Sequence, residues 1–243
     1  NNDIIFSGFF KAEAYFESDT LVSNGPVSMY YGKLTSNGQL RWVKKLSPSA
    51  SNSRILKVLS TNNGYVWLGN YQDSVFIDQD TLISENTDTD IFILKTDLNG
   101  NVEWIREIKG SSRELIRGAT IDDNYNIYLI GDTESLDLTV DSTSSEISSR
   151  NISFMGGKDM FIIKYLNSGN LSWIKYFGEI TNETGYDIFA KDSLLIIAGQ
   201  YADRIILDQD TLNANSNLDD AAFFSKMDKE GNILFSFDLN RLN

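Results

Sequence analysis

The chain has 243 residues, of which 41% are hydrophobic, so it can bury the core of one large or two small domains. Its 34 acidic residues exceed its 21 basic residues and give a net charge of −13, which disfavours binding to nucleic acids and anionic membranes. Cysteine and histidine are absent, which excludes disulfides, thiolate metal sites and catalysis by either side chain.

The first predicted strand is Asp3–Phe10, and four similar segments follow along the chain. Each contains an apolar run, a lysine, a polar turn with glycine, and a second run with an aromatic residue. The segments are SMYYGKLTSNGQLRWVKKL, DIFILKTDLNGNVEWIREI, DMFIIKYLNSGNLSWIKYF and AAFFSKMDKEGNILFSFDL. The lysines and the aromatics both recur at spacings of 62, 69 and 62, and they are Lys33, Lys95, Lys164 and Lys226, and Trp42, Trp104, Trp173 and Phe235. This period indicates a repeat architecture.

The glycine turns inside the four segments separate β-branched and aromatic runs, which predicts hairpins, and a second predicted hairpin precedes three of these segments. The predicted strand pairs are Ile55–Ser60 with Tyr65–Tyr71, Ala119–Asp122 with Ile127–Gly131, and Ile188–Lys191 with Leu194–Gln200. We interpret Gly8, Gly69, Gly131 and Gly199 as marking the ends of equivalent strands.

The repeat predicts an all-β chain of four units of about 62 residues, each with four antiparallel strands. The two middle strands of each unit are continuously apolar, which favours burial on both faces and therefore sheets that stack on one another. We predict a β-propeller, and stacked sandwiches are the alternative. The prediction is one domain, 1–243, with repeats 1–46, 47–109, 110–178 and 179–243. Because the first repeat lacks its first strand, we expect either an arc of a larger propeller or a ring whose closing strand lies outside this sequence.

The sequence Asp90–Gly131, DIFILKTDLNGNVEWIREIKGSSRELIRGATIDDNYNIYLIG, resembles the bacterial SBBP-type β-propeller repeat, and the resemblance recurs along essentially the whole chain. That family is common in secreted proteins of Bacteroidetes-like bacteria. The resemblance therefore implies the propeller fold and an extracellular or cell-surface location, but it implies no particular ligand.

A smaller repeat, FESDTLVS, FIDQDTLIS and LDQDTLNA, separates the second and third strands of three units. We interpret it as a short hairpin in which Asp caps a turn and Leu fills an apolar gap. The resemblance adds a second hypothesis, because Asp-Ser/Thr followed by an apolar residue or Thr is similar to the O-glycosylation signal of exported Bacteroidetes proteins. The candidate O-glycosylation sites are Thr20, Thr81, Thr211, Ser74, Ser142 and Ser193.

Two kinds of acidic motif are candidates for calcium binding. Asp97–Asn101 is similar to the start of a calcium loop, but the later Glu of such a loop is missing, so we interpret it as a hairpin turn. The pairs Asp88/Asp90 and Asp219/Asp220 leave open a weak calcium site, with solvated loop charge as the alternative. We predict no catalytic residue, no metal site and no cofactor.

The sequence thus favours a non-catalytic, extracellular β-propeller module whose loops bind a protein or glycan, or a structural spacer beside other domains of a longer surface protein. We expect neither nucleic-acid binding nor membrane insertion, since the longest apolar run, Leu194–Gly199, is too short to cross a bilayer. The alternative is a carbohydrate-active propeller enzyme that uses two of the 34 acidic residues as a carboxylate pair.

Overall fold

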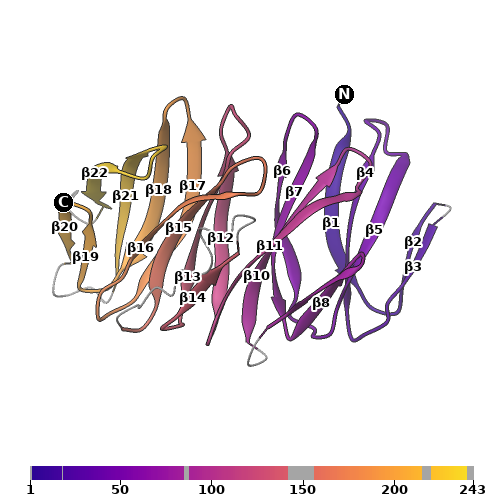
Figure 1. The fold of residues 1–243 in the computed structure, drawn as a ribbon, viewed down its shortest axis with the longest axis horizontal. Coiled ribbons are helices and arrows are strands. Elements are labelled where there is room, and N and C mark those ends of the chain that lie inside the picture. The colour runs from indigo at the N-terminus through magenta and orange to yellow at the C-terminus, as the bar shows by residue number, and fades with distance from the viewer. Residues whose placement is uncertain (1, 18, 85–87, 142–155, 215–219, 240–243) are drawn as a thin grey trace. The chain divides into compact units, whose positions relative to one another are not determined.

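A computed structural model describes residues 2–17, 19–84, 88–141, 156–214 and 220–239. The described residues contain no α-helix, and the strands pair antiparallel (Figure 1), so the prediction of an all-β chain is confirmed. No helix in this part of the chain could cross a membrane. The chain divides into two compact units, Asn1–Lys109 and Gly110–Asn243.

The first unit contains two sheets and two small hairpins. In spatial order, its first sheet holds β1 (Ile4–Phe10), β4 (Ser28–Leu34) and β5 (Leu40–Pro48), and its second holds β6 (Arg54–Ser60), β7 (Gly64–Gln72), β10 (Thr89–Asp97) and β11 (Val102–Gly110). The hairpins are β2 (Glu13–Phe16) with β3 (Asp19–Val22), and β8 (Ser74–Ile77) with β9 (Asp80–Ile83). The pair β8–β9 extends the first sheet beyond β5.

The second unit repeats this plan. Its sheets are β12 (Glu114–Ile121), β13 (Ile127–Thr133), β15 (Asp159–Tyr165) and β16 (Leu171–Phe177), followed by β17 (Glu183–Lys191), β18 (Leu194–Tyr201), β21 (Ala221–Asp228) and β22 (Ile233–Asp238). The unit also contains the short strand β14 (Leu138–Val140) and the hairpin β19 (Arg204–Leu207) with β20 (Asp210–Asn213). The two four-stranded sheets pack side by side (Figure 1) around one hydrophobic core.

The register of the strands confirms the alignment of the four segments. In every sheet the repeated lysine pairs with the repeated aromatic residue, and a bulge follows directly after the lysine. The pairs are Lys33 with Trp42, Lys95 with Trp104, Lys164 with Trp173, and Lys226 with Phe235. The predicted hairpins that precede three of the segments are β6–β7, β12–β13 and β17–β18.

Burial of the middle strands differs from sheet to sheet. Nearly every residue of β7, β10, β13 and β15 is buried, as their continuous apolar sequences predict. The equivalent strands β18 and β21 alternate between buried and accessible residues instead. Their buried side chains belong to the core shared with the preceding sheet, and the alternate side chains point to the opposite face.

The four repeated glycines have a different role from the one predicted. Gly8, Gly69, Gly131 and Gly199 lie within strands, and each is paired across the sheet with an aromatic residue, namely Tyr30, Phe92, Phe161 and Phe223. A Cβ at Gly69 would lie 2.7 Å from the Phe92 ring, and one at Gly131 would lie 2.5 Å from the Phe161 ring. The interpretation of these glycines as strand ends was therefore wrong, because they leave space for a ring on the neighbouring strand.

Candidate functional site

The three hairpins of the DTL repeat share one geometry. Thr20, Thr81 and Thr211 pair with the equivalent positions Tyr15, Phe76 and Ile206, and all three threonines are exposed. The loop aspartates Asp78 and Asp208 have φ values of 57° and 53°, a left-handed conformation that Asp tolerates. The predicted short hairpin is confirmed, and O-glycosylation of the exposed threonines stays a prediction.

The leucines beside these threonines point toward the protein interior. Leu212 is only 8% exposed and belongs to the core of the second unit, and Leu82 packs against the core of the first. Leu21 is half-buried. Because neighbouring residues of a strand point to opposite faces, an inward leucine requires an outward threonine. The inward leucine that the sequence predicts is therefore confirmed for Leu82 and Leu212, and capping of the turn by Asp stays a prediction.

The hairpins also join consecutive sheets, a role that the sequence interpretation missed. Residues Val75 and Phe76 of β8 pair with Pro48 and Ser47 of β5, so a hairpin of the second sequence repeat extends the sheet of the first. In the second unit, Asp208 Oδ1 lies 3.2 Å from Lys175 Nζ of β16. The other Asp208 oxygen accepts a hydrogen bond from the Ile233 backbone amide. No local sequence signal distinguishes this bridging aspartate from an ordinary turn residue.

The three candidate serines differ in accessibility. Ser74 is half-buried, and its hydroxyl lies 3.0 Å from that of Ser49. Ser193 is exposed in the turn between β17 and β18. Ser142 lies outside the described residues. Of the two described serines, Ser74 is the less accessible. O-glycosylation of the three serines stays a prediction.

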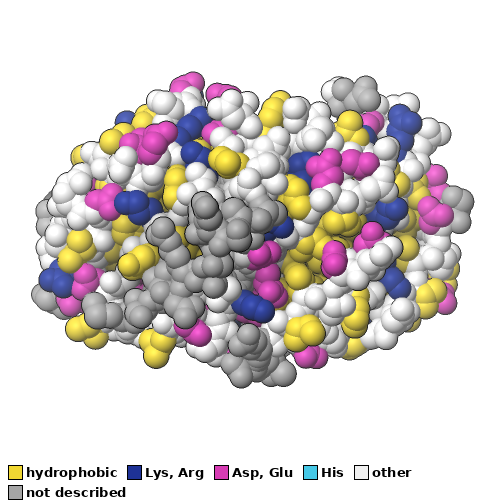
Figure 2. Space-filling model, in the orientation of Figure 1, with side chains coloured by type: hydrophobic (Ala, Val, Ile, Leu, Met, Phe, Trp, Pro, Cys, Tyr) yellow, Lys and Arg dark blue, Asp and Glu magenta, His cyan; other side chains and the backbone are white. Residues whose placement is uncertain are grey.

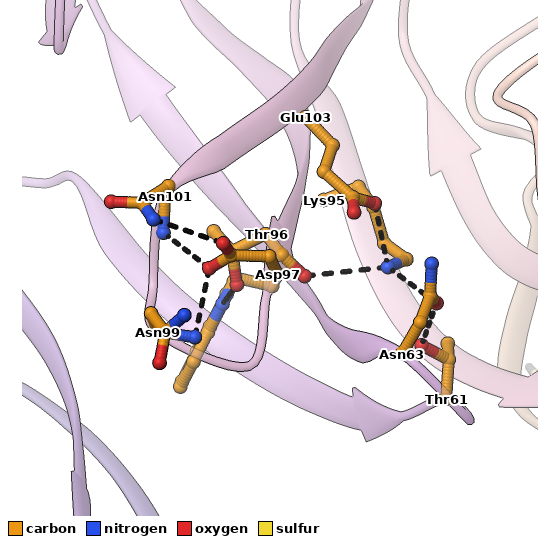
Figure 3. A network of polar contacts seen from close by, with 9 residues as sticks. Thr61, Asn63, Lys95, Thr96, Asp97, Asn99, Asn101 and Glu103 are labelled. Carbon is orange, nitrogen blue, oxygen red and sulfur yellow. Dashed lines mark hydrogen bonds and ion pairs between the residues drawn. The ribbon is translucent and has the colours of Figure 1, made fainter.

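The turn Asp97–Asn101 is a hairpin turn, as predicted (Figure 3). Asp97 Oδ1 accepts hydrogen bonds from the backbone amides of Asn99 and Asn101, and Oδ2 accepts one from the Asn101 side chain. Burial raises the pKa of Asp97, but the hydrogen bonds from Asn101 and Asn99 together outweigh this effect and hold the pKa below its usual value. The carboxylate thus stabilises its own turn, and Asp122 and Asp228 make the same three bonds in other turns.

Lys95 is a fully buried lysine beside this turn (Figure 3). Its ammonium group donates to Asn63 Oδ1 at 3.2 Å and to the Thr96 carbonyl at 3.3 Å, and it pairs with Glu103 at 3.0 Å. These partners account for the three donors of an ammonium group. Lys95 is therefore a structural residue at the base of the turn rather than a free nucleophile.

The interpretation of the two acidic pairs as solvated loop charge is wrong for Asp90 and fits Asp220. Asp90 is fully buried in β10, whereas Asp220 is exposed and Asp219 lies outside the described residues. Among the described residues, no group of three or more acidic side chains is arranged to hold a metal ion. The weak calcium site stays untested.

The second unit contains two buried carboxyl groups near each other. Asp159 is 2% exposed and Glu183 is fully buried. Glu183 accepts hydrogen bonds from the Glu179 amide and the Thr181 hydroxyl, whereas Asp159 Oδ1 has no partner among the described residues. Burial, together with the charge of Glu183, raises the pKa of Asp159 to about 7. A raised carboxyl pKa is a feature of residues that act in acid–base catalysis. Both of these carboxyl groups, however, are shielded from solvent.

Two surface pockets are candidates for ligand binding. The first, in the first unit, has a volume of about 540 Å³ and is lined by Pro26, Pro48, Phe76 and neighbouring loop residues. Phe76 is 52% exposed there. The second, of about 280 Å³, lies beside Glu179 and Arg204, which form an ion pair of 2.8 Å. Neither Asp159 nor Glu183 lines this second pocket.

Charged side chains of both signs are scattered over the face shown in Figure 2, rather than gathered into patches of one sign. Such a surface gives no electrostatic guide to one binding region.

Comparison with known proteins gives a distant similarity. No family model matches the sequence. An uncharacterised WD repeat-containing protein of Acanthamoeba polyphaga mimivirus is 22% identical over 239 residues; the match covers 83% of this chain but only 17% of that protein. A crystal structure of a protein of unknown function from Bacteroides caccae is 10% identical over 86% of this chain and 89% of that chain, with a TM-score of 0.27. The chain is thus similar to a repeat protein, and the SBBP-type assignment stays a prediction.

Proposed function

We propose that this chain is a stretch of a β-propeller and acts as a non-catalytic interaction module of an extracellular or cell-surface protein. Its loop surface would bind a protein or glycan partner, or the chain would space other domains. The proposal rests on the structural roles of the polar side chains that recur in the sequence. Asp97 stabilises its own hairpin turn, and Asp208 links its hairpin to Lys175 and Ile233 on neighbouring strands. The similarity to a WD repeat-containing protein supports a protein partner in particular.

The pocket beside Phe76 is the surface that we propose for a protein partner. Pro26, Pro48 and Phe76 provide apolar contact area, and the loop residues around them provide polar groups for orientation. Half-exposed aromatic residues of this kind are frequent anchors of protein interfaces. The proposal therefore concerns the loops beside β8 and the end of β5.

A binding experiment can test this assignment. A partner is first identified by crosslinking on the natural full-length protein, and its affinity for the isolated chain is then measured. We expect Phe76→Ser to weaken binding at least tenfold, and Leu136→Ser, which removes another exposed apolar side chain, to leave it unchanged. Equal affinity for all three proteins would contradict a binding site at Phe76.

The carbohydrate-active alternative receives less support. A glycosidase needs two carboxyl groups that flank a bound sugar in an open cleft. Asp159 and Glu183 are both almost completely buried, so a sugar could not reach them without movement of the surrounding strands. Turnover of a chromogenic glycoside that disappears in both Asp159→Asn and Glu183→Gln, with unchanged folding, would overturn the non-catalytic proposal.

A further inference from the structure

The chain contains four Asn-Gly steps, and the structure holds them in different ways. The steps are Asn24-Gly25, Asn37-Gly38, Asn63-Gly64 and Asn99-Gly100. An asparagine before glycine can lose its side-chain amide spontaneously, because glycine has no side chain to obstruct attack by its own backbone nitrogen. The attack requires a glycine amide that is not held in a hydrogen bond, and an asparagine side chain that is free to turn toward it.

Two of the steps lie in tight hairpin turns whose glycine amides are held. The Gly38 amide donates to the Thr35 carbonyl at 3.0 Å, and the Gly100 amide donates to the Asp97 carbonyl at 3.2 Å. Both glycines have positive φ values, 82° and 80°, as the turns require. Attack by either nitrogen would therefore break the hydrogen bond that closes its turn.

The third step is restrained through its asparagine side chain (Figure 3). The side-chain oxygen of Asn63 accepts hydrogen bonds from Lys95 at 3.2 Å and from Thr61 at 3.1 Å. The glycine that follows, Gly64, is buried at the start of β7 and pairs with Asp97 of β10. The side chain and the backbone of this step are thus both fixed.

The step Asn24-Gly25 has neither restraint. It lies in the loop between β3 and β4, and both residues are exposed. The Ser23 hydroxyl donates to the Gly25 carbonyl at 3.1 Å. Within the described part of the chain, however, no group accepts a hydrogen bond from the Gly25 amide or bonds to the Asn24 side chain. The pocket residues around this loop, Pro48 of its own sheet and Phe76 of the following hairpin, all belong to the first unit.

We propose that Asn24 is a site of spontaneous deamidation and isoaspartate formation in the folded protein. The Gly25 backbone nitrogen, once hydroxide has removed its proton, attacks the side-chain carbonyl carbon of Asn24. The bond from that carbon to the side-chain nitrogen breaks, and the nitrogen takes a proton from water and leaves as ammonia. The resulting cyclic imide is opened by water at either carbonyl group. One opening gives aspartate, and the other gives isoaspartate, in which the main chain runs through the side-chain carbons.

The reaction changes the surface of the pocket beside Phe76, because Asn24 is one of its lining residues. Either product replaces a neutral amide with a carboxylate, and isoaspartate also lengthens the main chain by a carbon atom. The pocket of an aged molecule therefore carries a negative charge that a newly made molecule lacks. The modification itself does not depend on partner binding at Phe76.

Peptide mapping of aged, folded protein tests the proposal. The chain and the natural full-length protein are kept in warm, mildly alkaline buffer and then digested briefly at slightly acidic pH, because conversion continues in alkaline digests. Mass spectrometry locates each deamidated residue, and fragmentation distinguishes isoaspartate from aspartate. We expect Asn24 to convert about tenfold faster than Asn37 or Asn99 and to give both products. A tenfold difference corresponds to about 1.4 kcal/mol, the scale of one hydrogen bond.

Two variants provide a matched comparison. Asn24→Gln should abolish conversion in this loop, because glutamine would have to close a larger and less favoured ring. Asn37→Gln changes an equally exposed Asn-Gly step and should leave the rate at Asn24 unchanged. Circular dichroism checks that both variants are folded. A fall in the Asn24 rate in the Asn37→Gln variant would contradict a reaction confined to the loop.

Ageing in concentrated urea separates the effect of the fold from that of the local sequence. Urea removes the restraints at the other three steps, so the four rates should converge. Equal rates at Asn24 and Asn99 in folded protein would overturn the proposal, as would aspartate without isoaspartate at Asn24, since a cyclic imide gives both. A rate advantage of Asn24 that is as large in urea as in folded protein would show that the fold does not select it. Aged full-length protein without isoaspartate at Asn24 would overturn the proposal as well.

Discussion

The indole N–H of Trp173 donates a hydrogen bond to the carbonyl oxygen of Lys229, 56 residues further along the chain, at 3.0 Å. Trp42 makes the equivalent bond to Leu98, also 56 residues away, at 3.1 Å. Each tryptophan thus reaches the turn of the following sheet. In the first unit the Trp42 ring leaves no room for a Cβ at Gly100, whose φ of 80° also favours glycine.

The first prediction concerns this contact. Trp173→Phe keeps an aromatic ring but removes the donor, so we expect the free energy of unfolding to fall by about 0.5–1.5 kcal/mol. Trp173→Ala also leaves a cavity and should cost about 3–5 kcal/mol. Urea unfolding measures both values. Phe235→Leu, measured at low protein concentration, is the control because Phe235 is 47% exposed, and a loss there as large as in Trp173→Ala would contradict the assignment.

The buried carboxyl group of Asp159 should make stability depend on pH. Burial and the charge of Glu183 raise the folded-state pKa of Asp159 from 3.8 to about 7, so the folded state binds a proton more tightly than the unfolded state. Stability from this group is therefore present at acidic pH and is lost as the pH rises toward and through 7. In urea titrations we expect Asp159→Asn to lose less stability than wild type as the pH rises from 3.8 to about 7, the range between the unfolded-state and folded-state pKa values. Parallel curves for the two proteins would contradict the prediction.

The turn aspartate Asp97 should have the opposite pH dependence. Its pKa is lowered in the folded state, so its stabilising effect is present above the unfolded value of 3.8 and is lost as the pH falls through the folded value. We expect Asp97→Ala to reduce the free energy of unfolding by about 1 kcal/mol at neutral pH, since the site is solvent-exposed. The difference from wild type should shrink in strongly acidic buffer. A constant difference over the whole pH range would show that the charge is not involved.

The ion pair between Lys175 and Asp208 should couple the last hairpin to the preceding sheet. Both side chains are partly exposed, so we expect a coupling energy of about 0.2–1 kcal/mol in a double-mutant cycle of Lys175→Met and Asp208→Asn. Asparagine is chosen because it tolerates the left-handed backbone at this position. Asp208→Asn keeps an amide oxygen that can accept the hydrogen bond from the Ile233 amide, so the cycle reports mainly on the ion pair. Additive effects of the two changes would exclude coupling.

The O-glycosylation hypothesis predicts added mass on natively produced protein. Thr20, Thr81 and Thr211 are exposed at equivalent hairpin positions, so we expect all three to carry a glycan and Ser74, whose hydroxyl lies against Ser49, to carry less. Peptide mass spectrometry measures the occupancy of each site. Thr81→Val should remove one glycan and leave the other sites occupied. Unmodified threonines in protein from the natural source would exclude the hypothesis.

The sequence by itself determined the repeated hairpins and their alignment with one another. Lys95 and Trp104 recur at the same spacing as Lys164 and Trp173, and because strands pair by local alternation and turn geometry, this spacing was enough to align the sheets. The outward threonine and inward leucine of the hairpins followed from the same alternation.

Only the tertiary structure decided what these elements contact. The rings over Gly69 and Gly131, the burial of Asp90 and Asp159, and the bridge from Asp208 to Lys175 all depend on neighbours distant in sequence. A local pattern cannot distinguish a solvated aspartate from a buried one, because desolvation is set by the sheets that pack around it. In the same way, Phe235 has the sequence position of a buried tryptophan, yet it is exposed because no described sheet of its unit covers that face.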